Sequence, residues 1–181
     1  MTGTTETFQL SLAAAEAYEA RFVPAIFGEW APHLVEAAGV APGQAVLAVD
    51  GGTVAVQVWD RLEAQAGYRP FFEVVARHAG EDAIELWSAY WALGDLELLA
   101  ALFQAAGLRV TTTRTHDGAV RFASTDELVR TEIEATPLGE RIGPEVHARL
   151  LEDAGAALHR FVTAGGRVEL PIRGHLVVAR A

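Results

Sequence analysis

The sequence predicts a single α+β domain in which helices flank a small mixed or antiparallel sheet of about four to six strands. Two apolar, β-prone runs lie on either side of Asp50-Gly51-Gly52. Helical apolar spacing dominates the residues before them, and β-branched runs return at 108–122 and 167–181. With 181 residues, 51% hydrophobic and 21% charged, the chain can bury a sizeable core.

The strand pair at 45–59 is the centre of the predicted fold. Asp-Gly between two apolar runs is a strong local hairpin signal, because glycine adopts the positive φ that a tight hairpin turn requires. The residues therefore predict two antiparallel central strands, Ala45–Val49 and Thr53–Trp59.

Two helical regions lie on either side of this strand pair. Residues 9–40 predict an N-terminal helical cap, which Pro24 should kink or break. Residues 60–107 predict further helices, one over Tyr68–His78 and another that Asp95 begins as its N-cap.

The later strands are predicted as short pieces. Leu108–Thr115 is β-branched and turns at Asp117-Gly118, so Ala119–Phe122 is expected to pair back on it. At the end of the chain, Arg167–Ile172 and His175–Ala181 read as two more strands.

A helical insertion is predicted between these strand regions, at 124–164. Ser124 and Glu127 have capping-box spacing and should begin its first helix. Pro144 stands where a first helical residue is favoured and opens a second helix over Glu145–Ala164.

Charge and composition exclude several function classes. The net charge of −10 argues against nucleic acid and anionic membranes as partners, because both need a basic surface. The absence of cysteine excludes disulfides, thiol nucleophiles and thiolate metal sites. No basic segment precedes an apolar block at the N-terminus, and no apolar run approaches the ~20 residues that span a bilayer. These features predict a cytoplasmic protein.

Two long blocks resemble class I S-adenosylmethionine-dependent methyltransferases that act on small molecules. The block AYEARFVPAIFGEWAPHLVEAAGVAPGQAVLAV at 17–49 is similar to the cap helices and first strand of that family. The block GGTVAVQVWDRLEAQAGYRPFFEVVARHAG at 51–80 is similar to its fifth strand and the segment after that strand, and ALGDLELLAALFQAAGLRV at 92–110 resembles the helix before its sixth strand. The resemblance implies a truncated Rossmann-like methyltransferase remnant.

The chain departs from that family between Val49 and Gly51. The family has its glycine-rich cofactor loop, second strand and adenine contacts there, and this chain has almost nothing. Asp50, Gly51 and Gly52 could imitate part of the loop, although the residues themselves favour a plain hairpin turn. The resemblance therefore implies that one chain binds no cofactor by itself.

Three functions are compatible with the resemblance and its departure. The first is a methyltransferase-like protein that lost most of the S-adenosylmethionine site and binds a small apolar or aromatic molecule, or carries out cofactor-free chemistry. The second is an active S-adenosylmethionine-dependent methyltransferase whose site is completed across a dimer. The third is a structural partner subunit of a full-length homologue. A homodimer is expected because lost central strands uncover apolar surface.

Aromatic residues supply the candidate substrate pocket. The resemblance implies that the cap and the segments after Trp59 together enclose the acceptor substrate, and the same side chains would serve equally as core or dimer interface. The candidate pocket residues are Tyr18, Phe22, Trp30, Trp59, Trp87, Tyr90 and Trp91.

Histidine supplies the candidate catalytic group. His33 could act as a general base that deprotonates a hydroxyl, or be an exposed or capping residue. The histidine spacings do not predict a metal site, because no pair lies four residues apart on one predicted helix.

Overall fold

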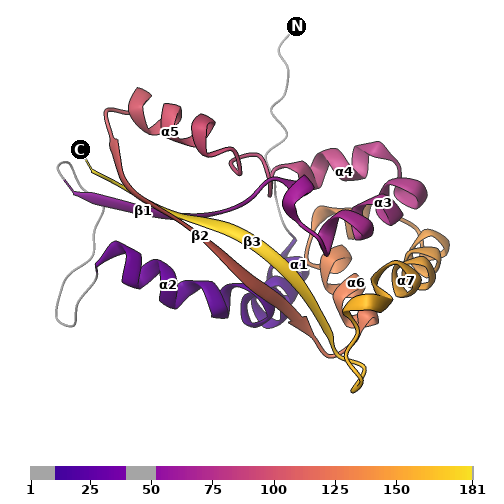
Figure 1. Ribbon diagram of the computed structural model, residues 1–181. Coiled ribbons are helices and arrows are strands. Elements are labelled where there is room, and N and C mark those ends of the chain that lie inside the picture. The colour runs from indigo at the N-terminus through magenta and orange to yellow at the C-terminus, as the bar shows by residue number, and fades with distance from the viewer. Residues whose placement is uncertain (1–10, 40–51, 181) are drawn as a thin grey trace, which may run out of the picture.

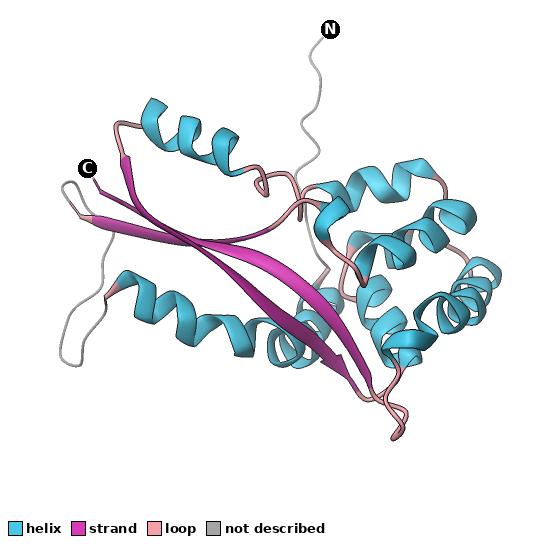
Figure 2. Cartoon of the chain, viewed as in Figure 1, coloured by secondary structure: helices cyan, strands magenta, loops and turns pink. Residues whose placement is uncertain are grey.

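Three antiparallel strands form an open sheet in the order β1-β3-β2, with helices against both faces and at one end (Figures 1 and 2). The computed structural model describes residues 11–39 and 52–180. Within them the strands are β1 (Thr53–Trp59), β2 (Arg109–Phe122) and β3 (Val168–Arg180). The predicted α+β class with a small sheet and flanking helices is confirmed.

The helices form three groups around this sheet (Figure 1). The N-terminal helices run along one face, α5 lies over the other, and the remaining helices gather at one end of the sheet. The α-helices are α1 (Leu12–Ala17), α2 (Gly28–Ala38), α3 (Tyr68–Ala79), α4 (Glu81–Ser88), α5 (Leu96–Ala105), α6 (Thr125–Glu134) and α7 (Pro144–Leu158). The other helical segments are the π-helix η1 (Tyr18–Phe27) and the 3-10 turns η2 (Leu62–Ala64), η3 (Pro137–Glu140) and η4 (His159–Phe161). None of the helices in the described ranges is long and apolar enough to cross a bilayer.

The helix caps agree with the local sequence signals. Asp95 accepts hydrogen bonds from two backbone N–H groups of α5, and Ser124 Oγ accepts one from the Glu127 N–H. Pro144 opens α7 as predicted. That helix ends at Leu158 rather than continuing to residue 164, because a 3-10 turn comes directly after it.

Pro24 does not break the N-terminal helices. In an α-helix the proline ring clashes with the carbonyl four residues back. Here Pro24 lies inside η1, whose wider turns have the i→i+5 pattern, so α1, η1 and α2 succeed one another without a break in the chain of helices.

The predicted turn at Asp117-Gly118 is wrong, because β2 is one continuous strand that pairs with β3 from Arg109 to Phe122, with an irregularity in the register at Thr111. Asp117 lies opposite Arg173, whose guanidinium donates to both carboxylate oxygens at 2.6 and 3.1 Å. Gly118 instead permits a close helix contact, since a Cβ there would lie 2.7 Å from Glu29 Oε1 of α2.

The two strands predicted at the C-terminus are also one strand, β3. Gly174 does not end it, because this glycine admits the Trp30 ring: a Cβ there would lie 2.8 Å from Trp30 Cη2. Pro171 is tolerated because β1 ends opposite Gly174, so β3 has a neighbour on one side only at the proline. These two mergers reduce the six predicted strands to four, and one of those four, Ala45–Val49, lies outside the described residues, so the described sheet has three strands.

β1 is the predicted strand Thr53–Trp59, but its partner in the structure is β3. The expected partner Ala45–Val49 and the turn residues Asp50 and Gly51 lie outside the described residues. Among the described strands β3 takes the central position. Every described strand pair is antiparallel, whereas a Rossmann-like sheet is built mainly from parallel strands.

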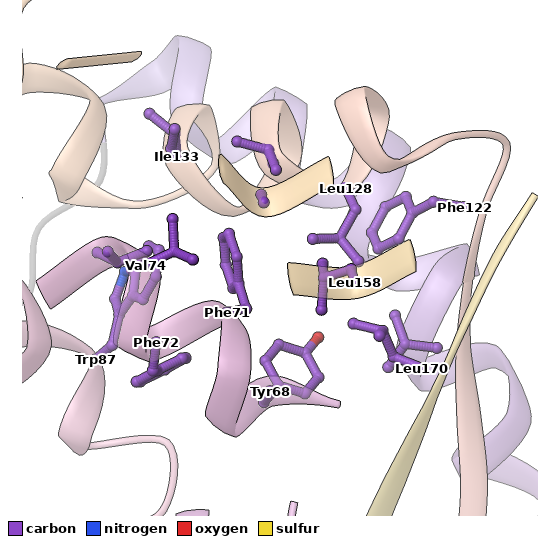
Figure 3. Packing of buried hydrophobic residues seen from close by; sticks show 14 of the residues in the cluster. Tyr68, Phe71, Phe72, Val74, Trp87, Phe122, Leu128, Ile133, Leu158 and Leu170 are labelled. Carbon is purple, nitrogen blue, oxygen red and sulfur yellow. The ribbon is translucent and has the colours of Figure 1, made fainter. Parts of the chain in front are cut away.

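The main hydrophobic core lies where α3, α4, α6 and α7 meet the end of the β2–β3 pair (Figure 3). Large side chains from helices and strands interdigitate there and are almost completely buried. Among them are Tyr68, Phe71, Phe72, Val74, Trp87, Phe122, Leu128, Ile133, Leu158 and Leu170.

Candidate functional site: an aromatic cavity around a buried glutamate

A cavity lies between the N-terminal helices and the α3, α4 and α6 side of the molecule. Eight of its eleven lining residues are aromatic, so the chemistry of its wall is mostly that of ring faces and edges. The lining residues of this aromatic cavity are Tyr18, Phe22, Ile26, Phe27, Trp59, Tyr68, Phe72, Tyr90, Trp91, Glu132 and Ile172.

The aromatic cavity is small inside and open at its rim. The space between its side chains is about 390 Å³ when the part that opens to solvent is included. Only about 30 Å³ admits the centre of a water-sized sphere. Because one water needs roughly 10–15 Å³ on this measure, the enclosed part holds two or three water-sized groups.

The π-helix η1 supplies one wall. Wider turns than those of an α-helix bring residues four and five apart onto one face, and Tyr18, Phe22 and Phe27 share the cavity face of η1 in this way. The Tyr18 and Phe22 rings stack at 5.1 Å between centroids, and Phe27 lies 6.1 Å from the Trp59 ring at the end of β1.

The opposite wall comes from α3 and the turn after α4. Trp91 packs against Tyr68 and Phe72, with ring centroids 5.3 and 5.9 Å apart. These three residues are buried, whereas Tyr18 and Tyr90 are half-buried at the rim. The buried indole Nε1 of Trp91 has no hydrogen-bond partner among the described residues.

Glu132 of α6 is the acidic group in the cavity lining. Its side chain is 2% exposed, and Tyr68 Oη donates a hydrogen bond to Glu132 Oε1 at 2.9 Å. Burial raises the pKa of the Glu132 carboxyl from its ordinary 4.5 to about 8, and the hydrogen bond from Tyr68 opposes this shift. Glu132 is therefore mainly a neutral carboxylic acid at pH 7.

Three phenol groups surround this acid. Burial raises the pKa of Tyr68 well above its usual value, and the Glu132 charge raises it further. Burial first and the Glu132 charge second also raise the pKa values of Tyr18 and Tyr90. All three hydroxyls stay protonated at physiological pH. The cavity can thus donate hydrogen bonds, and it can hold one positive charge if Glu132 ionises.

The structure brings five of the seven predicted pocket residues together and places two elsewhere. Tyr18, Phe22, Trp59, Tyr90 and Trp91 line the aromatic cavity. Trp30 and Trp87 are fully buried in the core and are not among the lining residues.

Trp30 and Trp87 each have a packing partner that accounts for their burial. The Trp30 ring meets Trp59 edge-on, with centroids 4.9 Å apart. The Trp87 ring lies 5.9 Å from Phe71, and its Nε1 donates to Thr136 Oγ1 at 3.3 Å.

The predicted catalytic and cofactor residues do not meet in this cavity. His33 is half-buried on α2, with its ring centroid 4.3 Å from that of His116 on β2. Asp50 and Gly51 lie outside the described residues, and Gly52 directly precedes β1. Among the described residues no group of three or more His, Asp or Glu side chains could hold a metal ion.

The aromatic residues are easier to find in the sequence than Glu132. An acidic residue on an amphipathic helix is usually on the solvent side. Leu128, Val129 and Ile133 mark the apolar face of α6, and Glu132 falls on that face because it is four residues from Leu128 and three from Val129. This spacing is the signal that could identify it.

A second polar group on the α5 side links β2 and β3 to Asp60, the residue that directly follows β1. Thr115 Oγ1 lies 3.0 Å from His175 Nδ1, and Asp60 Oδ1 lies 3.4 Å from His175 Nε2. His175 is 5% exposed and directly opposite Thr115 in the β2–β3 register. Both ring nitrogens therefore face protein groups, which suits a buried cross-strand link.

No protein-family model matches this sequence, and no curated protein matches it at the level expected of a homologue. The likeness to methyltransferases therefore depends on the sequence blocks alone and stays a prediction.

Proposed function

We propose that the protein binds a small apolar or aromatic molecule in the aromatic cavity. The observation that carries this proposal is a cavity whose wall is eight aromatic side chains around one buried acid. Ligand sites are typically apolar with a few placed polar groups, and groups with strongly shifted pKa values gather at functional sites. The unpartnered Trp91 Nε1 adds a donor that a ligand oxygen would satisfy.

The methyltransferase-like origin is part of this proposal. It is supported by the position of the cavity between η1 and the segments after Trp59, which are the two regions that the resemblance assigns to substrate enclosure. Loss of the cofactor site leaves binding, or cofactor-free chemistry, as the role of the cavity.

Tryptophan fluorescence tests the binding proposal directly. Trp59 and Trp91 line the aromatic cavity and Trp87 does not, so toluene or benzyl alcohol should change the emission of the wild-type protein. The change should shrink in Trp91→Phe and persist in Trp87→Phe. If millimolar probe alters neither the emission nor the protein NMR spectrum, the proposal is wrong.

Calorimetric titration with S-adenosylmethionine separates this proposal from its main alternative. We expect no heat at millimolar cofactor. Micromolar binding would support the active methyltransferase whose site is completed across a dimer. The proposal that the chain has lost its S-adenosylmethionine site would then be wrong.

A further inference from the structure

We propose that the ligand is a small organic amine, whose ammonium group pairs with Glu132 while its apolar part lies between the rings of the aromatic cavity. This inference rests on the proposed function and names the chemical class of the ligand.

The geometry of the cavity floor fits an ammonium group. Glu132 lies among ring faces and edges, and Tyr68 already orients one of its oxygens at 2.9 Å. Aromatic rings within about 6 Å attract a cation through their quadrupoles, most strongly when water is excluded. A buried carboxylate with an aromatic wall thus supplies both the counter-charge and the surrounding that a desolvated ammonium needs.

Charge balance favours a cation over an anion. The lining residues include one acid and no arginine, lysine or histidine. The helices η1 and α6, which both contribute lining residues, also carry an ion pair between Arg21 and Glu134 at 2.8 Å. Neither of these two residues lines the cavity. A positive ligand group would therefore be the only positive charge against Glu132 in the described lining.

The size of the cavity fits a narrow head group with a larger tail. The enclosed 30 Å³ holds two or three water-sized groups, which is enough for an ammonium group and the first carbon or two of its tail. The half-buried rim residues Tyr18, Phe27, Trp59 and Tyr90 leave the outer part open for an apolar tail. The Trp91 indole N–H is a donor and cannot accept a hydrogen bond from the ammonium, so it serves a ligand oxygen or a water.

Binding an amine in this way exchanges one cation for another. Glu132 is mainly protonated at pH 7, so an ammonium that enters forms its ion pair when the carboxyl proton leaves to solvent. The groups that face Glu132 are the hydroxyls of Tyr18, Tyr68 and Tyr90, which keep their protons over this range. About one proton should be released per ligand at pH 6.5, and clearly fewer at pH 8.5.

The experiment compares benzylamine with benzyl alcohol, which has nearly the same shape and no charge. Calorimetry in two buffers of different ionisation enthalpy gives both the affinity and the number of protons released. For the wild type we expect benzylamine to bind at least about tenfold more tightly, with proton release. Glu132→Gln should lose both the preference and the release.

The control variant is Glu134→Gln, on the same helix and 44% exposed, which should keep both properties. Near-UV circular dichroism checks that each variant is folded. Equal affinity of the wild type for both probes, or an unchanged preference in Glu132→Gln, would overturn the amine inference and leave the binding proposal standing. Failure of both probes to bind would contradict the proposed function itself.

Discussion

A carboxyl group that stays protonated at neutral pH lies in the lining of the aromatic cavity. Glu132 is buried with Tyr68 as its hydrogen-bond donor, and its pKa is raised to about 8 by that burial. In the unfolded chain the same group ionises near its ordinary pKa of 4.5. Between these two values the native state holds a proton that the unfolded state has lost.

This difference predicts a pH-dependent loss of stability. Because the native state binds more protons, the free energy of unfolding should fall by about 1.4 kcal/mol per pH unit between roughly pH 5 and pH 8 on account of Glu132. The contribution is full below about pH 4.5 and is lost by about pH 8. Urea unfolding of wild type and Glu132→Gln at several pH values measures it. Parallel profiles for the two proteins would contradict the prediction.

At the scale of elements, two glycines determine how α2 packs against the sheet. Gly118 and Gly174 lie inside continuous strands, where a Cβ would overlap Glu29 or Trp30. Local patterns predict a turn at the first and a strand boundary at the second, because glycine marks turns far more often than close contacts. The contact that explains them comes from a helix more than eighty residues away, which local patterns do not contain.

The same distinction separates the predictable parts of the site from the others. Caps such as Asp95 and Ser124 are local interactions, so their residue types alone identify them. The aromatic set is recognisable in the sequence, but whether Trp59 lines a cavity while Trp87 fills the core depends on packing. Glu132 is harder to predict, because its position on the apolar face shows only when its spacing from Leu128 and Val129 on α6 is traced.

Two glycine-to-alanine substitutions test this packing argument. Gly174→Ala should destabilise the protein by about 1–3 kcal/mol, because its Cβ would press on Trp30 and on the backbone oxygen of Val58, 2.9 Å away. Gly155→Ala on α7 meets nothing within 4 Å and should stabilise by about 0.5–1 kcal/mol through helix propensity. Urea unfolding midpoints measure the change in stability for each variant. Equal changes would show that the close contact of Gly174 with Trp30 does not limit the residue at this position.

At the scale of the whole molecule, a homodimer remains a prediction. Leu98 and Leu102 of α5 are each half exposed, as is Val35 of α2. Sedimentation at micromolar concentrations should show a dimer, and Leu98→Glu with Leu102→Glu should shift it towards monomer if α5 takes part. A wild type that stays monomeric would remove the dimer from the proposal.

The packing of the Trp30 side chain also depends on the register between β2 and β3. Its Nε1 lies 3.1 Å from where a Gly118 Cβ would be, and its Cη2 lies 2.8 Å from the same point at Gly174, so one indole spans both glycines. In the β2–β3 pairing Gly174 lies opposite His116, two residues from Gly118. A shift of two residues in the β2–β3 register would keep every side chain on the same face of the sheet. It would, however, move apart Gly118 and Gly174, the two positions where the lack of a Cβ makes room for the Trp30 ring. Packing of Trp30 against both glycines therefore favours the observed β2–β3 register. The hydrophobic pattern alone does not distinguish this register from one shifted by two residues.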